Sequence, residues 1–187
     1  MTEGLADARN RATERHVTLY RRWAEGGAGL LLTGNVQVDR RYLERGGNIV
    51  IDGPQEASQL SALEAMAEAG TTGGTHLWMQ ISHAGRQTPV LIASEPVGPS
   101  DVGVALPGGR FGKPRALSGD EIRDVIRRFA HAAGVARQTG FSGVQVHSAH
   151  GYLLSEFLSP RGFQRGFVVI LFFSQCGARQ WNGQQTT

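Results

Sequence analysis

The sequence has few lysines, few cysteines and no long apolar run. Lys113 is the only lysine, so the basic residues are almost all arginines, and they are dispersed rather than gathered in a stripe that would suit nucleic acid. The single cysteine, Cys176, excludes an intramolecular disulfide and suits a reducing compartment. The longest apolar run, residues 167–173, is far below the ~20 residues that a membrane helix needs.

Charges are present throughout residues 1–22, and no apolar core of a signal peptide interrupts them. We therefore expect a cytoplasmic protein with neither a membrane nor a nucleic acid as its partner. A chain of 187 residues is long enough to bury one sizeable core and is normally a single domain.

Helix-type and strand-type patterns alternate along the chain, which is typical of βα units around a parallel sheet. The sequence therefore predicts the α/β class. A capping box, Ser118-x-x-Glu121, marks the start of the third predicted helix. A Gly/Pro-rich loop over residues 82–117 is long enough to suggest an active-site cover. Helices are predicted at residues 14–25, 55–69 and 119–138, and strands at residues 30–33, 76–81 and 143–147.

The densest chemistry lies in the run GVQVHSAHGYLLSEFLSP, residues 143–160. His147, His150 and Tyr152 follow a predicted strand directly, and the C-terminal ends of parallel strands are where such folds place their chemistry. Taken alone, the two imidazoles allow a structural, a catalytic or a metal-binding role. A metal site has little support, because Glu156 is the only carboxylate nearby in the sequence.

Together with WMQISHAGRQ at residues 78–87, this run resembles the old yellow enzyme family of NADH:flavin oxidoreductases, which are FMN-dependent (β/α)8 barrels. The resemblance extends from Met1 to about Pro160. It implies a partial (β/α)8 TIM barrel, roughly the first half, over residues 1–160, with an atypical tail at 161–187. A whole barrel of this kind takes ~250 residues.

The resemblance also implies roles for individual residues. His147 and His150 would donate hydrogen bonds to the ligand oxygen, and Tyr152 would supply a proton to the substrate α-carbon. Gln80 would bind the flavin pyrimidine edge, Thr2 would bind flavin O4, and Asn35 would lie against the flavin. The implied cofactors are FMN and, as reductant, NAD(P)H, and the implied substrate is a small activated alkene.

The tail changes character, because residues 161–187 contain no acidic residue and no helical periodicity. It reads either as an altered terminus or as a short fifth strand at residues 167–173. In the family, the FMN phosphate is bound by later strands that the resemblance does not reach. We therefore expect weak FMN binding and little activity from this chain alone. Two alternatives stay open: a non-catalytic barrel fragment that self-associates through exposed sheet edges, and a metal-dependent hydrolase.

Overall fold

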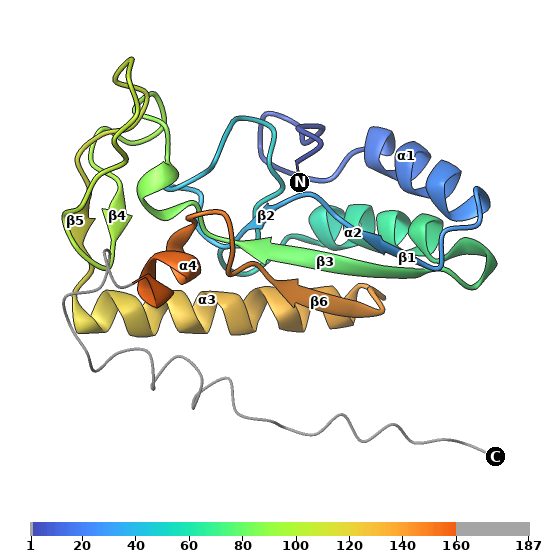
Figure 1. Ribbon diagram of the computed structural model, residues 1–187. Coiled ribbons are helices and arrows are strands. Elements are labelled where there is room, and N and C mark those ends of the chain that lie inside the picture. Colours follow the sequence, from blue (N-terminus) through green and yellow to red (C-terminus); the bar gives the residue numbers. More distant parts are fainter. Residues whose placement is uncertain (1, 160–187) are drawn as a thin grey trace.

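The structure is a computed structural model that describes residues 2–159 (Figure 1). The predicted tail at residues 161–187, with its alternative strand at 167–173, lies outside the described residues. No helix in the described part is long and apolar enough to cross a membrane.

The centre of the fold is a parallel sheet built around strand β3 (His76–Ser82). Strands β1 (Leu30–Leu32) and β2 (Val36–Gln37) pair one after the other with the same edge of β3. Strand β6 (Gly143–Val146) pairs with the other edge. All these pairings are parallel, so the strands carry their C-terminal ends to the same side. This is the arrangement of consecutive strands in a (β/α)8 barrel wall.

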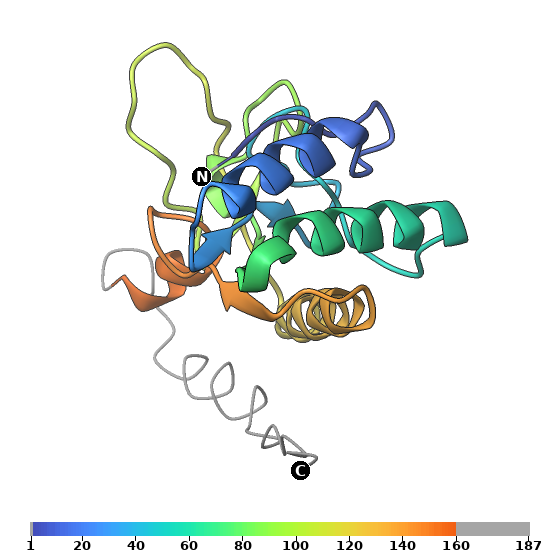
Figure 2. The same ribbon diagram turned by 90° about the vertical axis from the view of Figure 1, so that its right-hand side faces the viewer.

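Helices α1 (Glu14–Glu25), α2 (Ala57–Gly70) and α3 (Gly119–Gln138) lie on one side of this sheet (Figures 1 and 2). Alternate residues of β3 face them: Leu77, Met79 and Ile81 are at most 1% exposed. Because side chains alternate along a strand, the intervening residues point to the opposite face. That face would be the interior of a closed barrel.

The opposite face is open in the described residues. Trp78 on β3 is 38% exposed, and Leu30 on β1 is 49% exposed. Gly143, which pairs with Trp78, leaves room for its indole, because a Cβ there would come within 2.6 Å of the indole nitrogen. Large apolar side chains at such positions normally fill a barrel interior.

The segment predicted as one continuous loop, residues 82–117, contains short elements of secondary structure, so that prediction is corrected. Ser82 still belongs to β3, and a short 3-10 helix η2 (Gly85–Gln87) follows it. Strands β4 (Val97–Gly98) and β5 (Arg115–Ala116) then pair in parallel and join the middle of the loop to its C-terminal end. Strands of two residues carry no periodic signal, so the sequence could not show them.

The helices and strands predicted from the sequence agree closely with the structure. The helix at residues 14–25 is confirmed to the residue, and the capping box at Ser118 and Glu121 is present, with the hydroxyl oxygen of Ser118 accepting from the Glu121 N–H. Helix α2 begins two residues later than predicted, because Glu56 is extended and forms the N-cap. The structure adds a 3-10 turn η1 (Thr72–Gly74) and helix α4 (Leu153–Leu158).

Candidate functional site

His147 lies directly after β6, at the C-terminal edge of the sheet. Its backbone N–H donates to the carbonyl oxygen of Ile81 on β3 at 2.9 Å, which extends the ladder by one residue. The ring Nδ1 accepts from the N–H of Ala149 at 3.4 Å, so the proton of the neutral ring belongs on Nε2. Burial, with a smaller contribution from His150, lowers the pKa of His147 and favours this neutral form.

The Nε2 atom of His147 is a buried donor with no hydrogen-bond partner among residues 2–159. An unsatisfied buried N–H is costly, by ~1–3 kcal/mol, and is rare in folded proteins. His147 as a whole is 5% exposed, so bulk water does not compensate for this. A ligand oxygen at this position would remove the penalty.

His150 and Tyr152 complete an aromatic cluster around His147. The ring centroids of His147 and His150 are 5.1 Å apart, and those of His147 and Tyr152 are 5.0 Å apart, both in edge-to-face arrangements. The backbone of His150 is in the left-handed region at φ 60°, which is uncommon for a residue with a side chain. Gln87 secures this turn by donating from Nε2 to the His150 carbonyl oxygen at 2.6 Å. The structure therefore brings the three predicted residues together.

Glu44, in the segment after β2, was missed by sequence reasoning and lies against three of the predicted residues. The hydroxyl of Tyr152 and the side-chain amide of Asn35 both donate to Glu44 Oε2, each at 2.5 Å. The hydroxyl of Thr2 donates to the other carboxylate oxygen. Burial, followed by the hydrogen bond to Glu44, raises the pKa of Tyr152 and keeps the phenol protonated.

Gln80 is the predicted residue whose observed partner lies outside this cluster. It is 8% exposed, and its Nε2 donates to Oε1 of Gln145, its register partner on β6, at 2.5 Å. Its backbone N–H donates to the Thr33 hydroxyl at 2.9 Å. Gln145 was not singled out in the sequence, and only the parallel register places it beside Gln80.

The described residues fit the ring of a flavin. Asn35 Oδ1 is buried and has no hydrogen-bond partner within residues 2–159, so it is an acceptor suited to an imide N–H. The side-chain amide of Gln80 offers the same chemistry at the end of the neighbouring strand. None of Thr2, Asn35 and Gln80 is charged, so these side chains would suit the uncharged isoalloxazine better than a phosphate.

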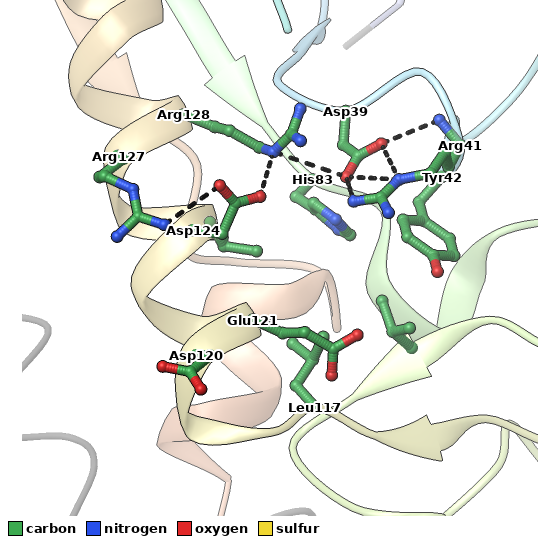
Figure 3. A pocket seen from close by; sticks show the side chains of 12 residues that line it. Asp39, Arg41, Tyr42, His83, Leu117, Asp120, Glu121, Asp124, Arg127 and Arg128 are labelled. Carbon is green, nitrogen blue, oxygen red and sulfur yellow. Dashed lines mark hydrogen bonds and ion pairs between the residues drawn. The ribbon is translucent and has the colours of Figure 1, made fainter.

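A second cluster lies between helix α3 and the segments that follow β2 and β3 (Figure 3). It lines a cavity of about 320 Å³. Asp39, with a side chain 2% exposed, accepts from the Arg41 guanidinium at 2.6 Å and lies 3.9 Å from Arg128, as the dashed lines show. Arg128 also pairs with Asp124 at 2.7 Å. His83 lies beside this network, fully buried, and burial lowers its pKa to about 4.

Metal binding is not supported at either cluster. In the described part of the chain, no group of three or more His, Cys, Asp or Glu side chains is placed to hold a metal ion. Glu156, the one acid near the imidazoles in sequence, packs elsewhere: its Oε1 accepts from the Arg86 N–H at 3.0 Å. Burial raises the pKa of Glu156 to about 8, so this carboxyl is mainly protonated at neutral pH.

Comparison with known proteins agrees with this architecture. The model of the NADH:flavin oxidoreductase / NADH oxidase family matches residues 1–166. An NADH-dependent flavin oxidoreductase from Hypocrea jecorina is 36% identical over 180 residues, which cover 88% of this chain and 45% of that protein. An NADH oxidase from Thermoanaerobacter brockii is 36% identical over 168 residues, which cover 88% of this chain and 25% of that protein.

Among solved structures, the old yellow enzyme homologue from Zymomonas mobilis superimposes with a TM-score of 0.77 at 28% identity. The match covers 89% of this chain and 47% of that one. The chain thus spans less than half of the length of each of these three proteins. The matched structures are TIM barrels, so the prediction of a partial (β/α)8 barrel is confirmed.

Proposed function

Because the chain belongs to the NADH:flavin oxidoreductase / NADH oxidase family, which uses FMN with NAD(P)H, we propose that it carries the substrate clamp and proton donor of an old yellow enzyme-type reductase of activated alkenes. The observation that carries this proposal is the buried, unpartnered Nε2–H of His147 beside His150 and Tyr152. The metal-dependent hydrolase loses its basis, because the family match supplies a different chemistry for the same imidazoles.

The two imidazoles act on the oxygen of the substrate. His147 and His150 donate to the carbonyl oxygen that activates the alkene, and their hydrogen bonds strengthen as this oxygen gains negative charge. The lowered pKa of His147 suits this task, since a neutral imidazole donates from Nε2 without adding a net charge. Removing one such donor typically costs ~10²–10³ in rate.

Tyr152 acts on the substrate carbon. Its phenol keeps its proton because burial and Glu44 raise its pKa, so a proton is available when the α-carbon becomes basic. When bound, reduced FMN supplies the hydride that adds to the β-carbon. Gln80 and Asn35 hold the edge of the flavin ring, and Thr2 is linked to Asn35 through the Glu44 carboxylate.

A second candidate is a non-catalytic fragment that self-associates, and one observation favours it. The inner face of the sheet exposes Leu30 and Trp78, and β6 has only one neighbour among the described strands. Exposed apolar faces and unpaired edges promote association. The presence of bound flavin in the purified protein separates this candidate from the first.

The enzymatic proposal is tested in a barrel chimera, in which residues 1–159 are joined to the C-terminal half of the Hypocrea jecorina relative. NADH should bleach its flavin without oxygen, and cyclohexenone should then restore the flavin colour. Tyr152→Phe should slow the second step by ~10²-fold or more and leave the first unchanged. Reoxidation by cyclohexenone at the same rate in this variant would refute the assignment of Tyr152.

A further inference from the structure

The Glu44 carboxylate is a junction of hydrogen bonds. Oε2 accepts from Tyr152 and Asn35, and Oε1 accepts from Thr2 and, at 3.5 Å, from the side-chain amide of Asn48. All four partners are donors, and an ionised carboxylate has only acceptors, so the two sides match. Every residue that the sequence places at this end of the site, apart from the imidazoles and Gln80, therefore meets at Glu44.

A second layer of hydrogen bonds holds Glu44 in place. The Asn48 amide donates to the carbonyl oxygen of Asn35 at 3.2 Å, and Asn48 Oδ1 accepts from the Arg45 N–H at 3.2 Å. Asn48 is 2% exposed, and Asn35 is 3% exposed. Side chains fixed in this way define the position of a functional group better than solvent-exposed ones.

Glu44 also reaches the outside of the site. It lines a cavity of about 530 Å³ together with Arg45, Leu91 and Arg110. Leu91 is 96% exposed, so this cavity opens to water. One carboxylate thus touches the half-buried phenol of Tyr152 on one side and a solvent-accessible cavity on the other.

We propose that Glu44 is the positioning residue of Tyr152: it orients the phenol, keeps it protonated between turnovers and returns a proton to it from cavity water. This inference rests on the proposed role of Tyr152 as proton donor. During turnover the O–H bond of Tyr152 breaks as a C–H bond forms at the substrate α-carbon. The resulting tyrosinate then takes a proton from solvent through the Glu44 carboxylate, so one solvent proton is consumed for each alkene reduced.

The carboxylate has two physical effects on Tyr152. The hydrogen bond to the carboxylate fixes the position of the phenol oxygen, and the O–H turns from Glu44 toward the substrate α-carbon when the proton is transferred. A tyrosinate beside a carboxylate is destabilised by like-charge repulsion, which drives rapid reprotonation. A residue that only filled space here would produce neither effect.

The test is a spectrophotometric titration of tyrosine in the whole 187-residue chain, which contains three tyrosines. The difference between the wild type and Tyr152→Phe isolates the ionisation of Tyr152, with circular dichroism recorded at each pH to define the folded range. In the wild type, Tyr152 should stay un-ionised above the ~10 of an ordinary tyrosine. Glu44→Gln should lower its midpoint by about one pH unit or more.

Three controls make the result specific. Glu44→Asp keeps a carboxylate and should retain most of the effect, and Glu44→Gln in the Tyr152→Phe background should change nothing. Glu3→Gln removes a carboxylate that instead accepts from the Gly34 N–H at 2.7 Å, and it should move the Tyr152 midpoint much less.

Two results would overturn the proposal: an unchanged midpoint in Glu44→Gln, or a wild-type Tyr152 that ionises like an ordinary tyrosine. The second needs no Glu44 variant, so the proposal stays testable if Glu44→Gln fails to fold. The titration needs neither flavin nor alkene. A failure of alkene reduction in the barrel chimera is therefore distinguishable from a failure of this inference.

Discussion

His83 and His147 occupy equivalent places in the fold and have nearly the same local structure. Each follows the last residue of its strand, β3 or β6, and each accepts on Nδ1 from the backbone N–H two residues further on, at 3.0 and 3.4 Å. Both are at most 5% exposed, and both have a buried Nε2 without a hydrogen-bond partner within residues 2–159. Burial lowers both pKa values.

The two histidines differ in what surrounds them. His83 lies near Asp39, whose charge is neutralised by Arg41 and Arg128, and its ring lies against Tyr42 at 5.4 Å between centroids. His147 lies against His150 and Tyr152, with no ion pair around it in the described residues. The burial of the imidazole and its hydrogen bond to the backbone are thus common to both strand ends. Its neighbours decide whether it orders a loop or binds a ligand.

The largest expected effect concerns FMN. The residues proposed to contact the flavin are uncharged, whereas Arg41 and Arg128 near His83 are already paired with carboxylates. Each charge-assisted hydrogen bond to a phosphate is worth ~1.5–3 kcal/mol. The 187-residue chain should therefore bind FMN about a thousandfold more weakly than the barrel chimera in equilibrium dialysis. Micromolar, stoichiometric binding of FMN by the chain alone would contradict the claim that neither region binds the phosphate.

The next effect is on stability and should be confined to the region of His83. Asp39→Asn removes the carboxylate that pairs with Arg41 and Arg128, and it should lower the free energy of unfolding by about 2 kcal/mol in urea denaturation. Binding of a phenol to the barrel chimera should stay the same, because no ion pair of Asp39 reaches His147. A loss of phenol binding at unchanged stability would reverse the roles of the two regions.

The sequence predicted those features of the two regions that depend on residues close together in the chain. Periodicity and capping predicted helices α1, α2 and α3 and strands β1, β3 and β6, because these patterns repeat within a few residues of each other. His147, His150 and Tyr152 were found because they are adjacent in the chain. Their roles stay predictions, and so do those of Thr2, Asn35 and Gln80.

Glu44 could not be found in the same way. It is 108 residues from Tyr152 in the sequence, and only the parallel packing of β2 and β6 on β3 brings the two together. Strands β2, β4 and β5 were missed because two residues carry no pattern. The one available signal was the density of charge in DRRYLER at residues 39–45, a short loop that supplies Asp39 to one region and Glu44 to the other.

A third effect should appear as a dependence of stability on pH. Glu156, which packs on the His83 side through Arg86, ionises near 4.5 in the unfolded chain and near 8 in the folded one. Between these values the folded chain binds more protons, so stability is full below about pH 4.5 and declines as the pH rises to about 8. Glu156→Gln should remove the part of this decline that falls between pH 5 and pH 6.5, about 2 kcal/mol in urea denaturation. An equal decline in wild type and variant would contradict the assignment.

The smallest effect should come from the segment between β4 and β5. Residues 105–110 are all exposed, and Gly108 and Gly109 have positive φ, which suits a hinge. Limited proteolysis should cut first between about residues 105 and 115 and leave the pairing of β4 with β5 intact. A phenol bound near His147 should slow this cleavage if the segment covers the site. Resistance of the segment in the absence of ligand would exclude a cover.

The most direct test of the central claim compares the two histidine regions by one spectrum. A phenol stacked on bound flavin produces a long-wavelength absorption band, and its titration in the barrel chimera reports the oxygen clamp. His147→Ala/His150→Ala should abolish the band, whereas His83→Ala, the matched change at the equivalent strand end, should retain it in the molecules that stay folded. A band of undiminished strength in the double variant would contradict the account.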